Sequence, residues 1–121
     1  MYRLGIIEES LNNKQVLRAL EPYIVNRRTE CIPDDPSPVW HINEYEIPDE
    51  QVAAIAEQLR KIILPTWYIH AFNDKRLIVV LMDRCFEMSL HRDQTWNDMI
   101  AYGVQVAHVE RHYLESIPLR V

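Results

Sequence analysis

The chain has 121 residues, a formal net charge of −5 at pH 7, 48% hydrophobic residues and 26% charged residues. These values are typical of globular proteins and exclude an intrinsically disordered chain, which combines low hydrophobicity with high net charge. The length predicts one domain over residues 1–121, and the acidic balance excludes a general nucleic-acid binder, which needs a basic surface to neutralise phosphates.

The first third of the chain changes from strand-like to helix-like spacing and back. Residues 2–8 read as a strand, and residues 10–22 have a helical pattern that Pro22 ends. Two further strand-like segments, 23–32 and 39–47, are separated by the proline-dense sequence PDDPSP. We expect them to form an antiparallel hairpin with a stiff loop, because proline cannot continue either strand.

The remainder begins with the clearest helical pattern of the chain, over residues 49–63, with Asp49 as the predicted N-cap. Three strand-like runs follow, separated by turn residues, and predict an antiparallel meander. These runs are residues 66–72, 76–82 and 85–90. A last helix is expected to begin near Asp93 or Thr95 and to run on toward the C-terminus.

Together these elements predict an α+β fold. The first six follow the β-α-β-β-α-β order of a ferredoxin-like split unit, extended here by a C-terminal β-meander and a third helix. In such a unit the helices cover one face of the sheet and leave the other face free. The fold alone predicts no activity, since many unrelated functions use it.

The apolar run LIVVLM, Leu77–Met82, has no polar residue on either face of the predicted strand. Something must therefore cover the second face of the sheet, either the last helix or a second copy of the chain. The run is far shorter than the roughly 20 residues that cross a bilayer, so we expect no membrane partner. Cys31 and Cys85 are far apart and no signal peptide precedes them, which predicts reduced thiols and a cytoplasmic location.

The segment HVERH, residues 108–112, raises the question of a metal site. On a continuous helix His108 and His112 would project from one face, a spacing that suits two imidazole ligands. The glutamate stands one position later than in metalloprotease helices, and no third ligand is evident. We therefore expect two solvated histidines and no metal, with His108 and His112 as a remote candidate pair.

Two aromatic and polar segments, WHINEY and WYIHAF, supply the candidate ligand-binding residues. Because side chains alternate along a strand, one set of three residues in WHINEY would share a face of that strand. A second set of three residues in WYIHAF would share a face of the other strand. The sets are His41, Asn43 and Tyr45, and Tyr68, His70 and Phe72. If the two faces coincide, these groups line a pocket in which a histidine acts as proton shuttle. The alternative is that each histidine bonds a strand neighbour and the aromatic rings fill the core.

By the same alternation, Glu44 and Glu46 fall on the opposite face, where we expect them to be solvated. No nucleophile, phosphate-binding or calcium-binding motif is present, so no cofactor is predicted. We expect a small cytoplasmic protein that is not an enzyme and that acts by protein binding or by forming a dimer. The contact surface would be an open sheet face or the 33–38 loop; the alternative is the His-lined pocket of an enzyme or small-molecule-binding protein.

Overall fold

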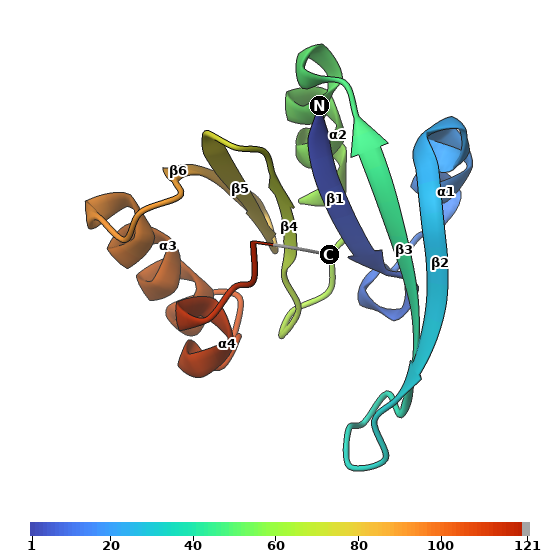
Figure 1. The fold of residues 1–121 in the computed structure, drawn as a ribbon. Helices are drawn as coiled ribbons and strands as arrows, with labels where there is room; N and C mark the ends of the chain where they lie inside the picture. Colours follow the sequence, from blue (N-terminus) through green and yellow to red (C-terminus); the bar gives the residue numbers. More distant parts are fainter. Residues whose placement is uncertain (120–121) are drawn as a thin grey trace.

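A computed structural model describes residues 1–119, which form one six-stranded antiparallel sheet with helices on both faces (Figure 1). In chain order the elements are β1 (Tyr2–Ile7), the 3-10 helix η1 (Glu8–Ser10), α1 (Gln15–Leu20), the 3-10 helix η2 (Glu21–Tyr23), β2 (Ile24–Cys31), β3 (Val39–Ile47), α2 (Asp49–Leu59), β4 (Ile69–Phe72), β5 (Arg76–Leu81), β6 (Arg84–Ser89), α3 (Gln94–Gln105) and α4 (Arg111–Glu115). The predicted α+β class is confirmed.

The strands lie in the order β2-β3-β1-β4-β5-β6, and every neighbouring pair is antiparallel. β5 and β6 extend the sheet beyond β4, so the sheet differs from that of a simple four-stranded β-α-β-β-α-β fold. The predicted hairpin of β2 with β3 and the predicted meander of β4, β5 and β6 are both present. β2 and β6 are the two edges of the sheet.

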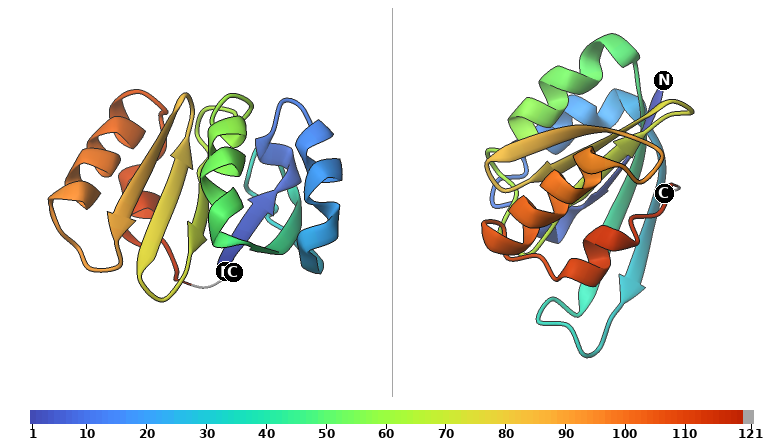
Figure 2. Two further views of the ribbon diagram at one scale, coloured as in Figure 1. Left: turned by 90° about the horizontal axis from the view of Figure 1, so that it is seen from above. Right: turned by 90° about the vertical axis from the view of Figure 1, so that its left-hand side faces the viewer.

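The first face of the sheet is covered by α1 and α2 (Figure 2). Alternate residues of β1, β3, β4 and β5 meet the apolar sides of these helices in one continuous core. Its fully buried members include Ile6, Tyr45, Ile47, Leu59 and Ile69. Burying five side chains of this size contributes on the order of 10 kcal/mol before conformational entropy is subtracted.

The second face is covered only over the meander, by α3 and α4 (Figure 1). Leu77, Val79 and Leu81 pack against these helices, whereas Ile78 and Val80 face the first core. The two-sided apolar run therefore has a helix on its far face, and no second copy is needed to bury it. The second core, as described, takes no residue from β1, β2 or β3, so α3 and α4 leave this half of the second face without a helix over it.

The helices α1 and α2 are shorter than predicted. A side-chain hydrogen bond sets a later start for α1, and backbone pairing with another segment follows the end of α2. The Asn13 side chain accepts the Gln15 backbone N–H at 2.8 Å, and α1 begins only there. α2 ends at Leu59, after which the Ile62 carbonyl accepts the Asn12 N–H and Ile63 forms a bridge with Leu11. These contacts join the end of α2 to the segment before α1.

The last long helix begins where the sequence predicts. The Asp93 carboxylate accepts the Thr95 backbone N–H at 2.9 Å, which satisfies one free donor of the first turn of α3. Within residues 1–119 no helix has both the length and the apolar character needed to span a bilayer.

Candidate functional site

The two sets of candidate ligand-binding residues lie on opposite faces of the sheet. Gly5 of β1 is the direct partner of Glu44 on β3 and of His70 on β4, and direct partners point to the same face. His70 therefore shares a face with Glu44, whereas Asn43 points to the face that α1 and α2 cover. The predicted sets do not converge on one pocket, and each forms a separate cluster.

In the first cluster, a glutamate of η1 holds His41. Glu9 Oε1 accepts the His41 backbone N–H at 2.7 Å, and Glu9 Oε2 lies 2.6 Å from His41 Nδ1. Burial raises the pKa of Glu9, but the hydrogen bonds from His41 outweigh it and leave this pKa below its usual value. In a neutral imidazole, a carboxylate at Nδ1 favours the tautomer that carries the proton there and leaves Nε2 as an acceptor.

Asn43 lies in the same cluster and ties η1 to the core. Its Nδ2 donates to Glu8 Oε2 at 2.9 Å and to the Tyr45 hydroxyl at 3.1 Å. Tyr45 is fully buried, and this burial raises the pKa of its phenol. Tyr45 is therefore a core side chain, and Asn43 donates a hydrogen bond to its hydroxyl. This agrees with the alternative that the aromatic rings of these strands fill the core.

A cavity of about 160 Å³ opens between η1, β2 and β3. Two cross-strand pairs, Arg27 with Asn43 and Thr29 with His41, point to its side of the sheet. Its lining is Glu8, Arg27, Arg28, Thr29, His41 and Asn43. The volume equals about five water molecules and is below the usual range of drug-sized sites. The sequence missed Glu8 and Glu9, because only tertiary contact brings η1 beside β3.

A second, shallower hollow of about 350 Å³ lies between α1 and α2. Exposed amide and lysine side chains and three small or aliphatic residues form its walls. The lining is Asn13, Gln15, Val16, Ala19, Gln58, Lys61 and Ile62. Lys61 is the one ionisable side chain in this lining, so no charged groups converge there and the hollow does not have the character of a site for chemistry.

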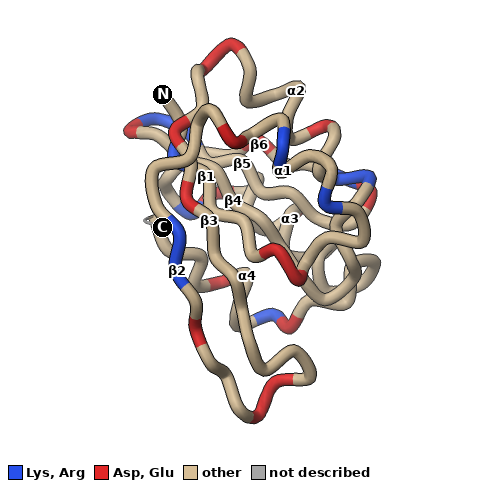
Figure 3. The backbone as a smooth tube through the Cα atoms, turned by 90° about the vertical axis from the view of Figure 1, so that its right-hand side faces the viewer, with Lys and Arg blue, Asp and Glu red and all other residues tan. Residues whose placement is uncertain are grey.

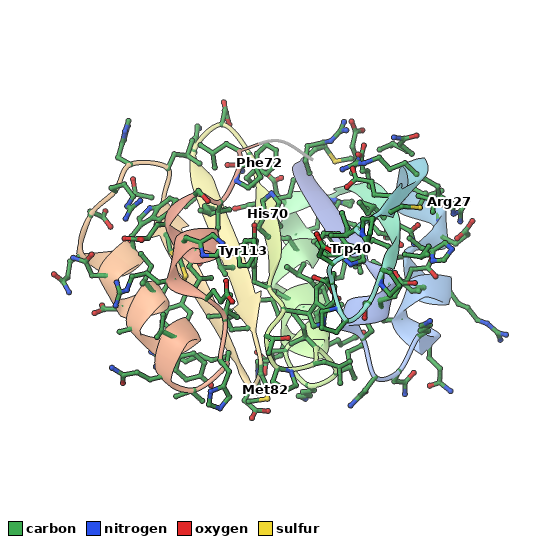
Figure 4. All side chains as sticks on the ribbon, turned by 90° about the horizontal axis from the view of Figure 1, so that it is seen from below. Arg27, Trp40, His70, Phe72, Met82 and Tyr113 are labelled. Atoms are coloured by element: carbon green, nitrogen blue, oxygen red, sulfur yellow. The ribbon has the colours of Figure 1, made fainter. Side chains whose placement is uncertain are left out.

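The second cluster is aromatic and lies on the other face, beside α4 (Figure 4). The His70 and Phe72 rings stack at 5.7 Å between centroids and 9° between planes, and Tyr68 lies 6.0 Å from His70. Burial raises the pKa of Tyr68, and the nearby Tyr113 phenol raises it further. His70 is buried, so it belongs to the aromatic packing rather than to a solvent-filled pocket.

Trp40 and Trp67 continue the aromatic surface toward β3, with an edge-on contact at 5.3 Å. The Trp40 indole Nε1 is buried and, in residues 1–119, has no hydrogen-bond partner. Because a buried donor without an acceptor costs about 1–3 kcal/mol, this indole N–H lowers the stability of the fold.

Glu44 was expected to be solvated, and this prediction is wrong. Only 6% of the residue is exposed, because arginines from both neighbouring strands lie over it. Arg28 of β2 contacts Glu44 Oε1, and Arg3 of β1 lies 3.8 Å from Oε2. On the open half of the second face, ion pairs therefore join β1, β2 and β3 beside the buried Ile42 and the half-buried Trp40 of β3.

The strand β2 is the free edge nearest to both this surface and the cavity. Seven of its eight residues are exposed, and it pairs only with β3. Seen from this side, basic residues of β2 are followed by acidic residues toward the loop (Figure 3). A bulge between Ile24 and Asn26 interrupts the pairing, after which the register is regular to Cys31.

The direction of each backbone N–H on β2 follows from two hydrogen bonds. The Ile32 N–H donates to the Pro38 carbonyl at 2.7 Å, which makes this pair a hydrogen-bonded one. Bonded and non-bonded pairs alternate in an antiparallel ladder, so Arg27, Thr29 and Cys31 point their N–H and C=O groups away from β3. The His41 N–H, opposite Thr29, indeed donates to Glu9 instead of to β2.

The histidines of HVERH do not share a continuous helix. α3 ends at Gln105, His108 has a positive φ of 58°, and α4 begins at Arg111. The premise of a helical i, i+4 pair is therefore wrong. His112 instead pairs with Glu110 at 3.4 Å. In the described part of the chain no three His, Cys, Asp or Glu side chains are grouped to hold a metal.

Comparison with known proteins finds no matching family model, no matching curated protein and no matching solved structure.

Proposed function

We propose that the chain acts by association, through strand addition at the free edge of β2. The observation that carries this proposal is the row of outward N–H and C=O groups on Arg27, Thr29 and Cys31. An extended segment placed beside β2 would satisfy these groups and prolong the sheet, a recurrent mode of protein recognition. The open, charged half of the second face adjoins this edge and would meet the side chains of the added segment.

Several expectations from the sequence support a protein partner. The net charge of −5 opposes phosphate binding, so we propose a protein rather than a nucleic acid. We also propose a cytoplasmic location, in keeping with the unpaired thiols of Cys31 and Cys85 in the described chain. For the fold, we propose a ferredoxin-like unit over residues 2–72, because its neighbour order β4-β1-β3-β2 places both of its helices on one face.

Amide exchange measured by NMR tests the strand-addition proposal. When no strand is added at β2, the amides of Arg27, Thr29 and Cys31 should exchange rapidly. The amides of Arg28 and the other even-numbered residues of β2 bond to β3 and should be protected. Raising the protein concentration, or adding excess peptide with the sequence of residues 24–32, should protect the odd-numbered amides selectively. If these amides stay unprotected at every concentration and with the peptide, the edge does not accept a strand and the proposal fails.

Thr29→Pro is the matching variant. It removes an outward N–H and leaves the ladder with β3 intact, because proline is tolerated on an edge strand when its missing N–H faces solvent. Arg28→Pro is the control, since it would remove a bond to β3 and lower stability. Thr29→Pro should abolish the selective protection and keep the melting temperature within a few degrees.

A second candidate function is supported by the Glu9–His41 pair at the 160 Å³ cavity. A histidine with a carboxylate at Nδ1 and a free Nε2 beside a polar cavity is suited to accept a proton from a small ligand. Glu8 and Arg27 give the lining both signs of charge, which fits a small zwitterion. NMR titration with glycine, methylammonium and acetate compares zwitterion, cation and anion; glycine should shift the Thr29 and Asn43 signals most.

His41→Gln separates a ligand role from a core role in this cavity. The His41 side chain is 52% exposed, so the variant should retain nearly full stability while the glycine-dependent shifts disappear. His112→Gln, at another exposed histidine, is the matched control and should leave the shifts unchanged. Unchanged shifts in His41→Gln would remove the ligand-binding candidate.

A further inference from the structure

Resting on strand addition at β2, we propose that the added strand is β2 of a second copy, paired antiparallel about Thr29. Two copies related by a two-fold axis present the same edge to each other, so the contact is isologous. In this arrangement the two six-stranded sheets become one continuous sheet of twelve strands. The charges and the hydrogen-bonding directions along β2 select both the partner and the register.

Hydrogen-bonding direction limits the registers first. Only Arg27, Thr29 and Cys31 point their backbone groups outward within the regular part of β2, so a bonded pair must join two odd-numbered residues. In every register that meets this condition, the numbers of two directly opposed residues add up to an even number. Side chains opposite one another also point to the same face, as an antiparallel pair requires.

Length limits the register further. The bulge after Ile24 and the proline at position 33 bound the regular segment to residues 26–32, whose centre is Thr29. Pairing about Thr29 uses the whole segment. If the centre of pairing moves by one residue, to Arg28 or Glu30, residues at both ends of the paired segment are left without a partner.

Charge decides among these centres. About Thr29, Arg28 of each copy stands opposite the partner's Glu30, and both lie on the second face of the sheet. A centre at Arg28 would place two arginines opposite each other, and a centre at Glu30 would do the same with two glutamates. Opposite charges in directly opposed positions stabilise a strand pair and like charges destabilise it, so the centre at Thr29 is preferred.

The register makes specific predictions for disulfide cross-linking. Thr29 faces the partner's Thr29 in a bonded pair, where Cα atoms are about 5.5 Å apart, within reach of a disulfide. Native Cys31 faces the partner's Arg27 and lies about 14 Å from the partner's Cys31, which is too far. Wild-type chains should therefore not cross-link through Cys31 when oxidised.

Three cysteine variants test this register. Thr29→Cys with Cys31→Ser should form a disulfide-linked dimer under mild oxidation. Arg27→Cys should cross-link when Cys31 is present and should lose the cross-link when Cys31→Ser is added. Cross-linking of Arg27→Cys in the Cys31→Ser background, or failure of Thr29→Cys to cross-link in a sample that is dimeric, would overturn the register.

Oligomeric state, measured by light scattering after size exclusion, tests the partner itself. Wild-type chains should form a dimer whose population falls on dilution. Glu30→Arg, at an exposed position, replaces both opposite-charge pairs by like-charge pairs and should raise the dissociation constant about tenfold or more. Glu46→Arg, on the same face but outside β2, is the matched control and should leave the dimer unchanged.

The outcomes separate this inference from the function on which it rests. A monomer at all concentrations whose odd-numbered amides become protected on adding the peptide refutes the second copy as partner but keeps strand addition. A dimer in which these amides stay unprotected refutes both, because another surface then forms the contact. A dimer with protected amides and the predicted cross-links supports both.

Discussion

Exchanging Glu44 for glutamine tests the ion-pair network that holds the open half of the sheet together. The carboxylate is 8% exposed as a side chain and accepts a bond from Arg28, which comes from the neighbouring edge strand. Glutamine has nearly the same shape and keeps an acceptor oxygen, so the exchange removes the charge with little change in packing. The stability lost then measures the contribution of the charge.

The size of the loss follows from the exposure of the partners. A hydrogen bond to a charged group contributes about 1.5–3 kcal/mol when shielded, and an exposed ion pair about 0–1 kcal/mol. The Arg28 side chain is 38% exposed and the Arg3 side chain 42%, so water screens both, and Arg3 at 3.8 Å is beyond hydrogen-bond distance. We therefore expect Glu44→Gln to lower the free energy of unfolding by about 1 kcal/mol.

Thermal unfolding followed by circular dichroism is a suitable assay. For 121 residues the unfolding entropy is about 0.25 kcal/mol/K, so 1 kcal/mol corresponds to a fall in melting temperature of about 4 °C. Glu46→Gln is the matched control on the same strand and face. Its side chain is 44% exposed, and we expect a change below about 2 °C. Equal shifts in the two variants, or a more stable Glu44→Gln, would refute the reasoning.

Three further predictions concern the core, the thiols and acid stability. Leu81→Ala, at a fully buried position of the second core, should cost about 2–4 kcal/mol in urea unfolding. Burial raises the pKa of Cys85 to about 11, so iodoacetamide at pH 8 should label exposed Cys31 and leave Cys85 unmodified until the protein unfolds. The pKa of Glu9 is lower in the folded protein than in the unfolded chain, so this carboxylate stabilises the fold at pH values above its usual pKa. That contribution is lost as the pH falls through the lowered pKa. Glu9→Gln should therefore lower the free energy of unfolding at pH 7 and flatten the acid limb of a pH–stability curve.

The sequence predicted the six strands and the three longest helices because each has a strong local signal, but it did not predict η1, η2 or a separate α4. Alternation and turn residues located the hairpin and the meander, and the Asp93 cap located the start of α3. Local signals were insufficient where contacts between distant segments decide the outcome. α2 ends before Ile62 because the backbone there pairs with the segment that precedes α1, and nothing within residues 49–63 indicates this.

The candidate site shows the same limit more clearly. Alternation assigned His41 and Asn43 to one face of their strand and His70 to one face of another. Whether those faces coincide depends on the register of both strands with β1, which lies between them. A shift of one residue in either ladder reverses every side chain, so the sequence of the two segments cannot decide it.

The position of the free edge follows from the order of the elements along the chain. α3 follows β6 directly, and its Trp96 donates to the Ser89 carbonyl at the end of that strand, so α3 covers the β6 side of the sheet. β2 lies at the far edge, five strands away, and the helices that follow it in the chain pack over the other strands. We therefore expect association at β2, where pairing Arg28 of one copy with Glu30 of the other would favour the proposed register over registers that place like charges opposite each other.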